Sequence, residues 1–540
     1  MRAALHETVA APPARTPWHA CAAEALAVAA LLPLAAAVAF SLAGAGGAGA
    51  YAQWWGTPRG WIALGRTLHL AGLAAALAVV LAWVLVAGAG PWPRRWGGAV
   101  AWLACLPMLV PSSLVATAWI VALGREGPLT RAVQAALGDV RPDVYSLSAA
   151  ALVLALRYFG LAALVIESVR RRQEARWPAE RVFRIPRGAA ALHLHLRPAL
   201  GATLAAGLLV MLFAMNDHII PGMLLVSTYG TQVLIQYSAL LDPQGATALA
   251  APMAAVGAAA AAVVLWGGKW TWRDLDGPAP TVPAPRSAIA RALGAAAVAA
   301  VLALALAVPA VVLAQGAGSW RALGDALAVA RREVLQTLFV SAVAGALCMA
   351  AAALLAARWV SAWRRGAWTA APLVLLNLTV PPSLLGIGTI QLTQSPGLDA
   401  VRDTCWPLVF GYVARFLPVA TLVLYGLWRR EPSEPLAAAR VHGVSGWQTA
   451  WRVLWPRHRR ALVAAGLLAA LLAATELETS ILLAPAGAGT LGVRLYTLIH
   501  TAPPSVTSAL ALDILILVGP AILVLGWLLA QARGRTSEGQ

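Results

Sequence analysis

The sequence has little charge and almost no lysine. Only 11% of its 540 residues are charged, and the formal net charge of +18 comes from arginine, because Lys269 is the sole lysine. Hydrophobic residues make up 60% of the chain, and the mean hydropathy is +0.74. A soluble domain of this size could not cover its surface with so few charges. The composition therefore indicates an all-α polytopic membrane protein.

Cysteine is also scarce. The four cysteines, Cys21, Cys105, Cys348 and Cys405, are scattered in or beside apolar runs. They have no paired spacing and no nearby histidines that would form a metal centre with them. We therefore predict packing roles for the cysteines and no metal site.

A phosphate-binding loop of the form G-x-x-x-x-G-K-[S/T] is missing. Lys269 lies in "GGKWTW" and is followed by tryptophan, so the chain cannot hydrolyse ATP by that route. No cluster of Ser and His, or of His, Asp and Glu, occurs at catalytic spacing. We therefore predict no catalytic residue and no cofactor in this chain, which leaves an intramembrane enzyme as the third interpretation.

Long apolar runs are what the sequence has in abundance. A spanning helix needs roughly 20 apolar residues, and about a dozen runs reach that length. They lie near 22–44, 62–88, 99–123, 147–168, 199–216, 246–267, 291–315, 333–357, 368–390, 406–428, 461–484 and 507–530.

Arginines gather in short clusters on one side of these predicted spans. The clusters are Arg94 with Arg95, residues 170–197, Arg358 with Arg364 and Arg365, and residues 429–460. Positive residues beside spans mark the cytoplasmic face and contact anionic lipid, which explains the basic charge better than nucleic acid does. Both termini are thus predicted to be cytoplasmic, while opposite loops such as 217–245 lack basic residues.

The two halves of the sequence resemble each other. "TLHLAGLAAALAVVLAWVLV" from Thr67 is echoed by "TLFVSAVAGALCMAAAALLA" from Thr337, "ALRYFG" by "VARFLP", and "ATALA" by "TSALA". The spacing stays near about 260 to 270 residues, which indicates two parallel six-helix repeats. The predicted organisation is a cytoplasmic tail (1–21), a first repeat (22–267), a Pro-rich cytoplasmic linker (268–290), a second repeat (291–530) and a cytoplasmic tail (531–540).

One cytoplasmic stretch, "AAARVHGVSGWQTAWRVLWPRHRRAL" at 437–462, predicts a small helical element. Ala437, Ala438 and Ala439 would let another surface approach closely, and Gly443 is placed to end their helix in a left-handed conformation. Trp447 begins an apolar stripe on a second helix, which Pro456 is expected to stop. The alternative is a helix pair that only rests among the lipid head groups.

The spacing of Ala438, Ala439, Gly443 and Pro456 resembles the cytoplasmic EAA signature of ABC importer permeases. Ala437 replaces its glutamate, but the glycine and proline match in register. In that family the loop forms a coupling helix that docks on a cytoplasmic ATPase subunit. The resemblance implies coupling roles for Ala437 to Ala439, Gly443, Trp447 and Pro456, and implies the type I importer fold.

A weaker copy lies in the first half, in "EARWPAERVFRIPRGAAALHLHLRPAL" at 174–200. Glu174 and Ala175 could begin the motif and so contribute to coupling. Glu180 or Arg181 falls where the glycine should be. This copy docks with altered geometry, or its register is shifted by a residue or two.

The segments that end each half, 216–245 and 476–500, resemble fused two-repeat permeases of the iron(III) type. Thiamine, polyamine and phosphonate permeases are close to that group. The resemblance implies a bacterial inner-membrane protein, a homodimeric ATPase partner that binds ATP and Mg, and a periplasmic binding protein that delivers iron(III) or a related metal complex. Thiamine, polyamines and phosphonates are the alternative substrates.

Two polar residues lie after the fifth predicted helix of each half. They are Asp217 and His218 in the first half, and Glu476 and Glu478 in the second. An ionised group at bilayer depth costs roughly 2.5 to 3.5 kcal/mol unless it faces water or a partner. They could line the pathway, or they could lie at periplasmic helix ends in solvent or in structural hydrogen bonds. Single polar residues near span ends are attributed to snorkelling or capping; they are Arg66, His69, Arg157, Glu167 and Asp513.

The main alternative is a proton- or ion-coupled secondary transporter, which can also have twelve helices in two parallel repeats. Such a carrier is expected to bury carboxylates within its helices and to carry a basic signature between helices two and three. Here "GPWPRRWGG" at that place has no acidic partner, and the long cytoplasmic insert follows helix four instead.

Overall fold

The computed structural model describes residues 18–43, 58–89, 94–174, 189–272, 288–365, 369–429 and 455–537 apart from 486, and a few single positions between them. Every regular element in these ranges is helical. Within these described ranges, six helices are long and apolar enough to cross a membrane, or up to nine segments if each of three bent helix pairs is one span. The all-α membrane class is confirmed, whereas twelve spans stay a prediction.

The first half contains twelve described helices. They are α1 (Trp18–Ala29), α2 (Leu32–Ala43), α4 (Pro58–Ala89), α5 (Arg94–Cys105), the 3-10 helix η1 (Leu106–Leu109), α6 (Ser112–Leu123), α7 (Pro128–Leu137), α8 (Leu147–Glu174), α10 (Ala189–Asn216), α11 (Ile219–Met223), α12 (Tyr229–Ser238) and α13 (Pro243–Trp272).

The second half repeats the order of these elements. It contains α14 (Ala288–Leu302), the π-helix η3 (Ala303–Ala307), α15 (Val308–Ala317), α16 (Trp320–Val329), α17 (Arg331–Arg365), the 3-10 helix η4 (Ala371–Leu375), α18 (Leu376–Thr379), α19 (Pro382–Thr393), α20 (Asp399–Arg402), α21 (Trp406–Trp428), α24 (Trp455–Ala474), α25 (Glu478–Leu483), α26 (Leu491–Thr501) and α27 (Pro504–Ser537). Thus α4, α8, α10, α11, α12 and α13 correspond in order to α17, α21, α24, α25, α26 and α27.

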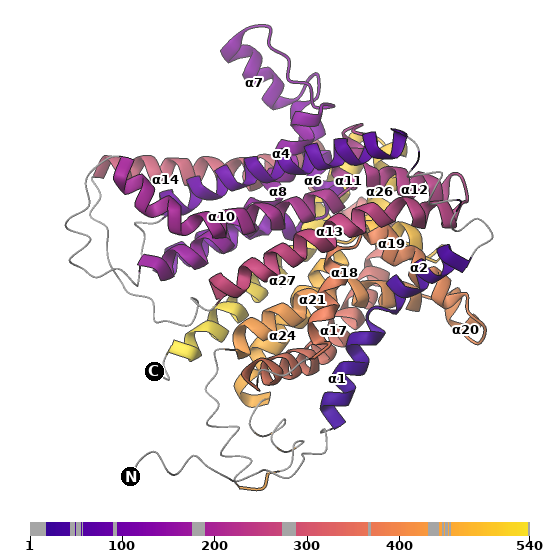
Figure 1. Cartoon of the computed structure of the whole chain (residues 1–540). Coiled ribbons are helices and arrows are strands. Elements are labelled where there is room, and N and C mark those ends of the chain that lie inside the picture. The colour runs from indigo at the N-terminus through magenta and orange to yellow at the C-terminus, as the bar shows by residue number, and fades with distance from the viewer. Residues whose placement is uncertain are drawn as a thin grey trace, which may run out of the picture.

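The first helices of each half pack on the other half. Helices α1 and α2 contact α17 and α19, while α14 and α15 contact α4 and α6 (Figure 1). Helices α4 and α14 cross where Gly88 meets Gly294, and a Cβ on Gly88 would lie 2.6 Å from the carbonyl oxygen of Gly294. Because the first helices of each half pack on the opposite half, the two halves are interlocked.

Proline bends the equivalent helix pair in each half. Pro111 precedes α6 and Pro381 precedes α19, and the preceding residues, Val110 and Val380, have extended ψ angles of 141° and 139°. Proline disfavours a helical conformation in the residue before it. The pairs bend by 92° and 114°, so the predicted straight spans 99–123 and 368–390 are broken helices.

Several predicted boundaries are wrong. Segment 217–245 is not an open loop, because it folds into α11 and α12. The predicted span 461–484 ends as a helix at Ala474. Pro456 lies in the first turn of α24, where a missing N–H costs nothing, and the helix predicted before it falls mostly outside the described residues. Helix α27 continues through Ser537, into the predicted C-terminal tail.

Threonine hydroxyls fix the short helices α12 and α26 to the long helix of their own half. Thr67 Oγ1 on α4 accepts a hydrogen bond of 2.8 Å from Tyr229 N, and Thr337 Oγ1 on α17 accepts one of 2.8 Å from Leu491 N. Each hydroxyl thereby satisfies a backbone donor that a helix N-terminus leaves unpaired. The first residues of α12 and α26 are therefore anchored in the protein interior.

Candidate functional site: a buried charged cluster between the halves

The four polar residues predicted after the fifth span lie together in the protein interior. Asp217, His218, Glu476 and Glu478 are each 4 to 9% exposed. A cavity of about 80 Å³ lies between the halves, and its wall includes the three carboxylates. That volume has room for a few water molecules. The solvent-exposed alternative for these residues is therefore wrong, while their role in a pathway stays a prediction.

Asp217 is held entirely by groups of the first half. Its Oδ2 accepts hydrogen bonds from Ser112 Oγ at 2.9 Å and Tyr158 Oη at 3.0 Å, and its Oδ1 accepts one from Ile220 N at 3.2 Å. The last contact caps α11, because an anion is favoured at a helix N-terminus. Arg157 Nε lies 3.6 Å from Asp217 Oδ2.

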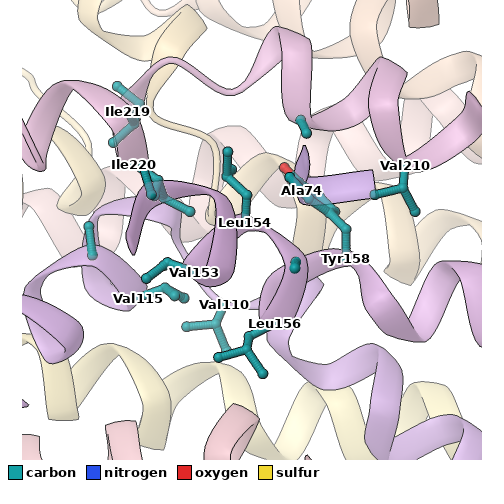
Figure 2. Close-up of a cluster of buried hydrophobic side chains, with 14 of the residues drawn as sticks. Ala74, Val110, Val115, Val153, Leu154, Leu156, Tyr158, Val210, Ile219 and Ile220 are labelled. Atoms are coloured by element: carbon teal, nitrogen blue, oxygen red, sulfur yellow. The ribbon is translucent and has the colours of Figure 1, made fainter. Parts of the chain in front are cut away.

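Arg157 is buried near the middle of α8. Its guanidinium donates to Pro107 O at 3.2 Å, to Met108 O at 3.4 Å and to Val110 O. These carbonyls lie where η1 ends and the chain bends, and among them Pro107 O also accepts a bond of 3.4 Å from Val110 N. The snorkelling interpretation of Arg157 is therefore wrong, because the guanidinium binds inside the protein. Figure 2 shows the apolar side chains packed around its neighbour Tyr158.

The second half has an arginine at the equivalent place, Arg415 on α21. Its partners are two carboxylates, whereas Arg157 also donates to backbone carbonyls. Arg415 Nε lies 3.2 Å from Glu476 Oε2, and Nη2 lies 3.3 Å from Glu478 Oε2. Glu476 Oε1 also accepts from Thr479 N at 3.1 Å, which matches the way Asp217 caps α11. One guanidinium therefore serves two carboxylates, and its side chain is 21% exposed.

His218 and Glu478 join the halves. Glu478 Oε1 accepts a hydrogen bond of 3.0 Å from His218 N and lies 3.3 Å from His218 Nδ1. A carboxylate only accepts hydrogen bonds, so a hydrogen bond at this contact requires the hydrogen on Nδ1. Within the described residues, His218 Nε2 has no hydrogen-bond partner.

The cluster contains three carboxylates and two guanidinium groups. Buried charges are tolerated when they are paired and hydrogen-bonded, and this set is one positive charge short. Asn216 and Asn377 also line the cavity, and the Oδ1 of each has no partner within the described part of the chain. An interior rich in oxygen acceptors favours a cation or a proton and repels anions.

A dedicated metal site is not present in the described ranges. Those ranges contain no group of three or more His, Cys, Asp or Glu side chains placed to hold a metal ion. The cysteines among them are free, and Cys348 is buried in packing contacts. The arrangement pairs Asp217 with Arg157 within the first half, pairs Glu476 and Glu478 with Arg415 within the second, and joins the halves through His218 and Glu478.

The predicted coupling residues fall mostly outside the described residues. Ala175, Ala437 to Ala439 and Trp447 lie outside, as does the side chain of Glu174. Gly443 is described and has a φ of +66°, the left-handed conformation that the sequence predicts. A Cβ at this position would meet no atom within 4 Å, so the backbone conformation alone requires glycine.

Sequence reasoning missed Arg415, Ser112 and Tyr158 as members of the cluster. A signal was present, because "ALRYFG" and "VARFLP" place an arginine at the same point of an apolar run in both halves. A charged residue within a span is rare and faces a partner inside the protein.

Comparison of the chain with protein-family models, with curated proteins and with solved structures found no match.

Proposed function

We propose that the chain is the transmembrane permease subunit of an ATP-driven ABC importer. The observation that carries the proposal is the φ of +66° at Gly443. The resembled EAA signature has its glycine at this position, between the coupling helix and the segment that returns to the membrane. A left-handed glycine ends many short helices, so the support comes from its place in register with Ala438, Ala439 and Pro456 of the resembled signature.

The translocation path of the proposed importer runs between the two halves. Both halves contribute to the cavity wall, with Asp217 from the first and Glu476 and Glu478 from the second. The surplus of carboxylates favours positively charged cargo over anions. Iron(III) or a related metal complex is the proposed substrate, and thiamine and polyamines, which are cations, fit the same charge better than phosphonates do.

The proposed partners supply what the chain lacks. A pair of ATPase subunits binds ATP and Mg at the cytoplasmic face, one near each half, and a periplasmic binding protein delivers the cargo. The bacterial inner membrane is the proposed location. The N-terminal ends of α10 and α14 and the C-terminal end of α27 lie on one side of the molecule (Figure 1), and the sequence has arginines at or next to each of these ends, which supports a shared cytoplasmic face.

A gradient-coupled secondary carrier is the second candidate, because one observation favours it. Asp217 and Glu478 are buried at the boundary between the halves, as coupling carboxylates of a carrier would be. They lie at breaks between helices, however, and each has a guanidinium partner. Arg157 neutralises Asp217 without a coupling ion, whereas Glu476 and Glu478 share the single charge of Arg415.

Co-purification tests the proposed function. We expect the full chain, extracted from its native membrane in a mild detergent, to retain an ATPase that contains a phosphate-binding loop, at two copies per chain. Mass spectrometry and light scattering measure identity and stoichiometry, and an unrelated polytopic protein from the same membrane is the control. A chain that stays without an ATPase even after crosslinking in the membrane contradicts the importer.

A further inference from the structure

The contact between His218 and Glu478 differs from the other contacts of the three cluster carboxylates. Asp217 is bound by Arg157, Ser112, Tyr158 and Ile220 N, all of the first half. Glu476 is bound by Arg415 and Thr479 of the second half. Among the described partners of these carboxylates, only His218 comes from the opposite half to its carboxylate.

The cavity beside this contact is small, because its volume of about 80 Å³ has room for only a few water molecules. Passage of a larger solute between the halves requires the walls to separate. Separation leaves the Arg157–Asp217 and Arg415–Glu476 pairs intact, because each moves with its own half. It breaks the contacts of Glu478 Oε1 with His218 N and Nδ1.

We propose that His218 and Glu478 form a latch that holds the two halves closed around the cavity. The proposal rests on the proposed path between the halves, and it applies to an importer and to a carrier alike. Glu478 keeps a partner in its own half when this contact opens. Glu478 keeps Arg415 Nη2 at 3.3 Å through its other oxygen when His218 withdraws, so no carboxylate is left without a cation.

The histidine side of the latch also separates easily. His218 Nε2 has no hydrogen-bond partner within the described residues, so withdrawal of the imidazole from Glu478 breaks no other side-chain hydrogen bond of His218. The residues that face the contact are Arg415 on α21, Glu476 before α25, and Asp217 with Arg157 from the first half, and they stay paired among themselves.

Thiol labelling tests the latch. The reporter is Thr475→Cys, a buried position on the cavity wall, in the full chain with its four native cysteines replaced by alanine. Membrane vesicles of both orientations are exposed to a charged, membrane-impermeant thiol reagent. We expect Glu478→Leu to raise the labelling rate at least fivefold from one side. His218→Leu removes only the Nδ1 contact and keeps the bond from the backbone N of residue 218, so it should raise the rate less, and the double variant should match Glu478→Leu.

Two further variants make the test specific. Glu478→Gln retains an oxygen that accepts from His218, so its increase should be smaller than that of Glu478→Leu. Glu333 forms an ion pair of 3.9 Å with Arg494 inside the second half. Glu333→Leu breaks this pair and should leave the labelling rate unchanged. Unchanged labelling in folded Glu478→Leu and His218→Leu, or an equal rise in Glu333→Leu, would overturn the latch. Labelling needs neither ATP nor cargo, so failure of the latch and failure of the importer are separate results.

Discussion

Replacement of Arg157 by leucine should remove most of the folded protein from the membrane. The change takes the charged partner from Asp217 and the guanidinium donor from the carbonyls of Pro107, Met108 and Val110. Loss of one partner of a buried ion pair costs about 3 to 5 kcal/mol. We expect a large fall in thermal stability, measured by unfolding of the detergent-purified chain.

Two variants separate this effect from a simple loss of charge. Arg157→Lys keeps the positive charge but cannot reach three carbonyls with a planar fork, so it should recover only part of the stability. Arg402→Leu breaks an exposed pair with Asp399 and should cost less than about 1 kcal/mol. If Arg157→Leu unfolds at the temperature of Arg402→Leu, Arg157 does not hold the bend after η1.

Replacement of Gly443 by valine should uncouple ATP hydrolysis from transport. The φ of +66° is strained for a β-branched residue by about 1 to 2 kcal/mol, which is a factor of about 5 to 30 in the population of the docked conformation. Open space around the position excludes a steric clash as the cause. The measurement is ATP hydrolysis by the assembled transporter, stimulated by the loaded binding protein.

The matched control is Arg181→Val, at the equivalent position of the first loop, where no glycine is present. We expect Arg181→Val to change stimulated hydrolysis much less than Gly443→Val does. Both variants should insert normally, because neither position lies in a predicted span. Equal losses in the two variants, or no loss at Gly443, would mean that the second loop is only an interfacial anchor.

Composition and periodicity were sufficient to predict the all-α membrane class and the positions of the long spans. Helices α4, α8, α17, α21 and α27 lie where apolar runs predict them, because about 20 consecutive apolar residues have few other stable arrangements. The left-handed Gly443 was predicted from its place after a short helix. These features depend on local sequence, which is why the sequence alone can identify them.

The bends and the charged cluster could not be predicted in this way. A proline within an apolar run is compatible with a kinked span, and the bends of 92° and 114° depend on what packs against them. Arg157 stands beside η1 only after α8 has packed on the bend, and Glu478 meets His218 from the other half. Such contacts join residues 50 and 260 positions apart, and no local pattern encodes them.

The energy source for transport tests the central claim most directly. The chain is reconstituted in vesicles with and without the ATPase, and uptake of radiolabelled iron(III) citrate, delivered by the binding protein, is measured. The importer predicts uptake only when the ATPase and ATP are both present, and none from a proton or sodium gradient applied to the chain alone. Accumulation driven by either gradient without ATP would contradict the importer and identify a secondary carrier.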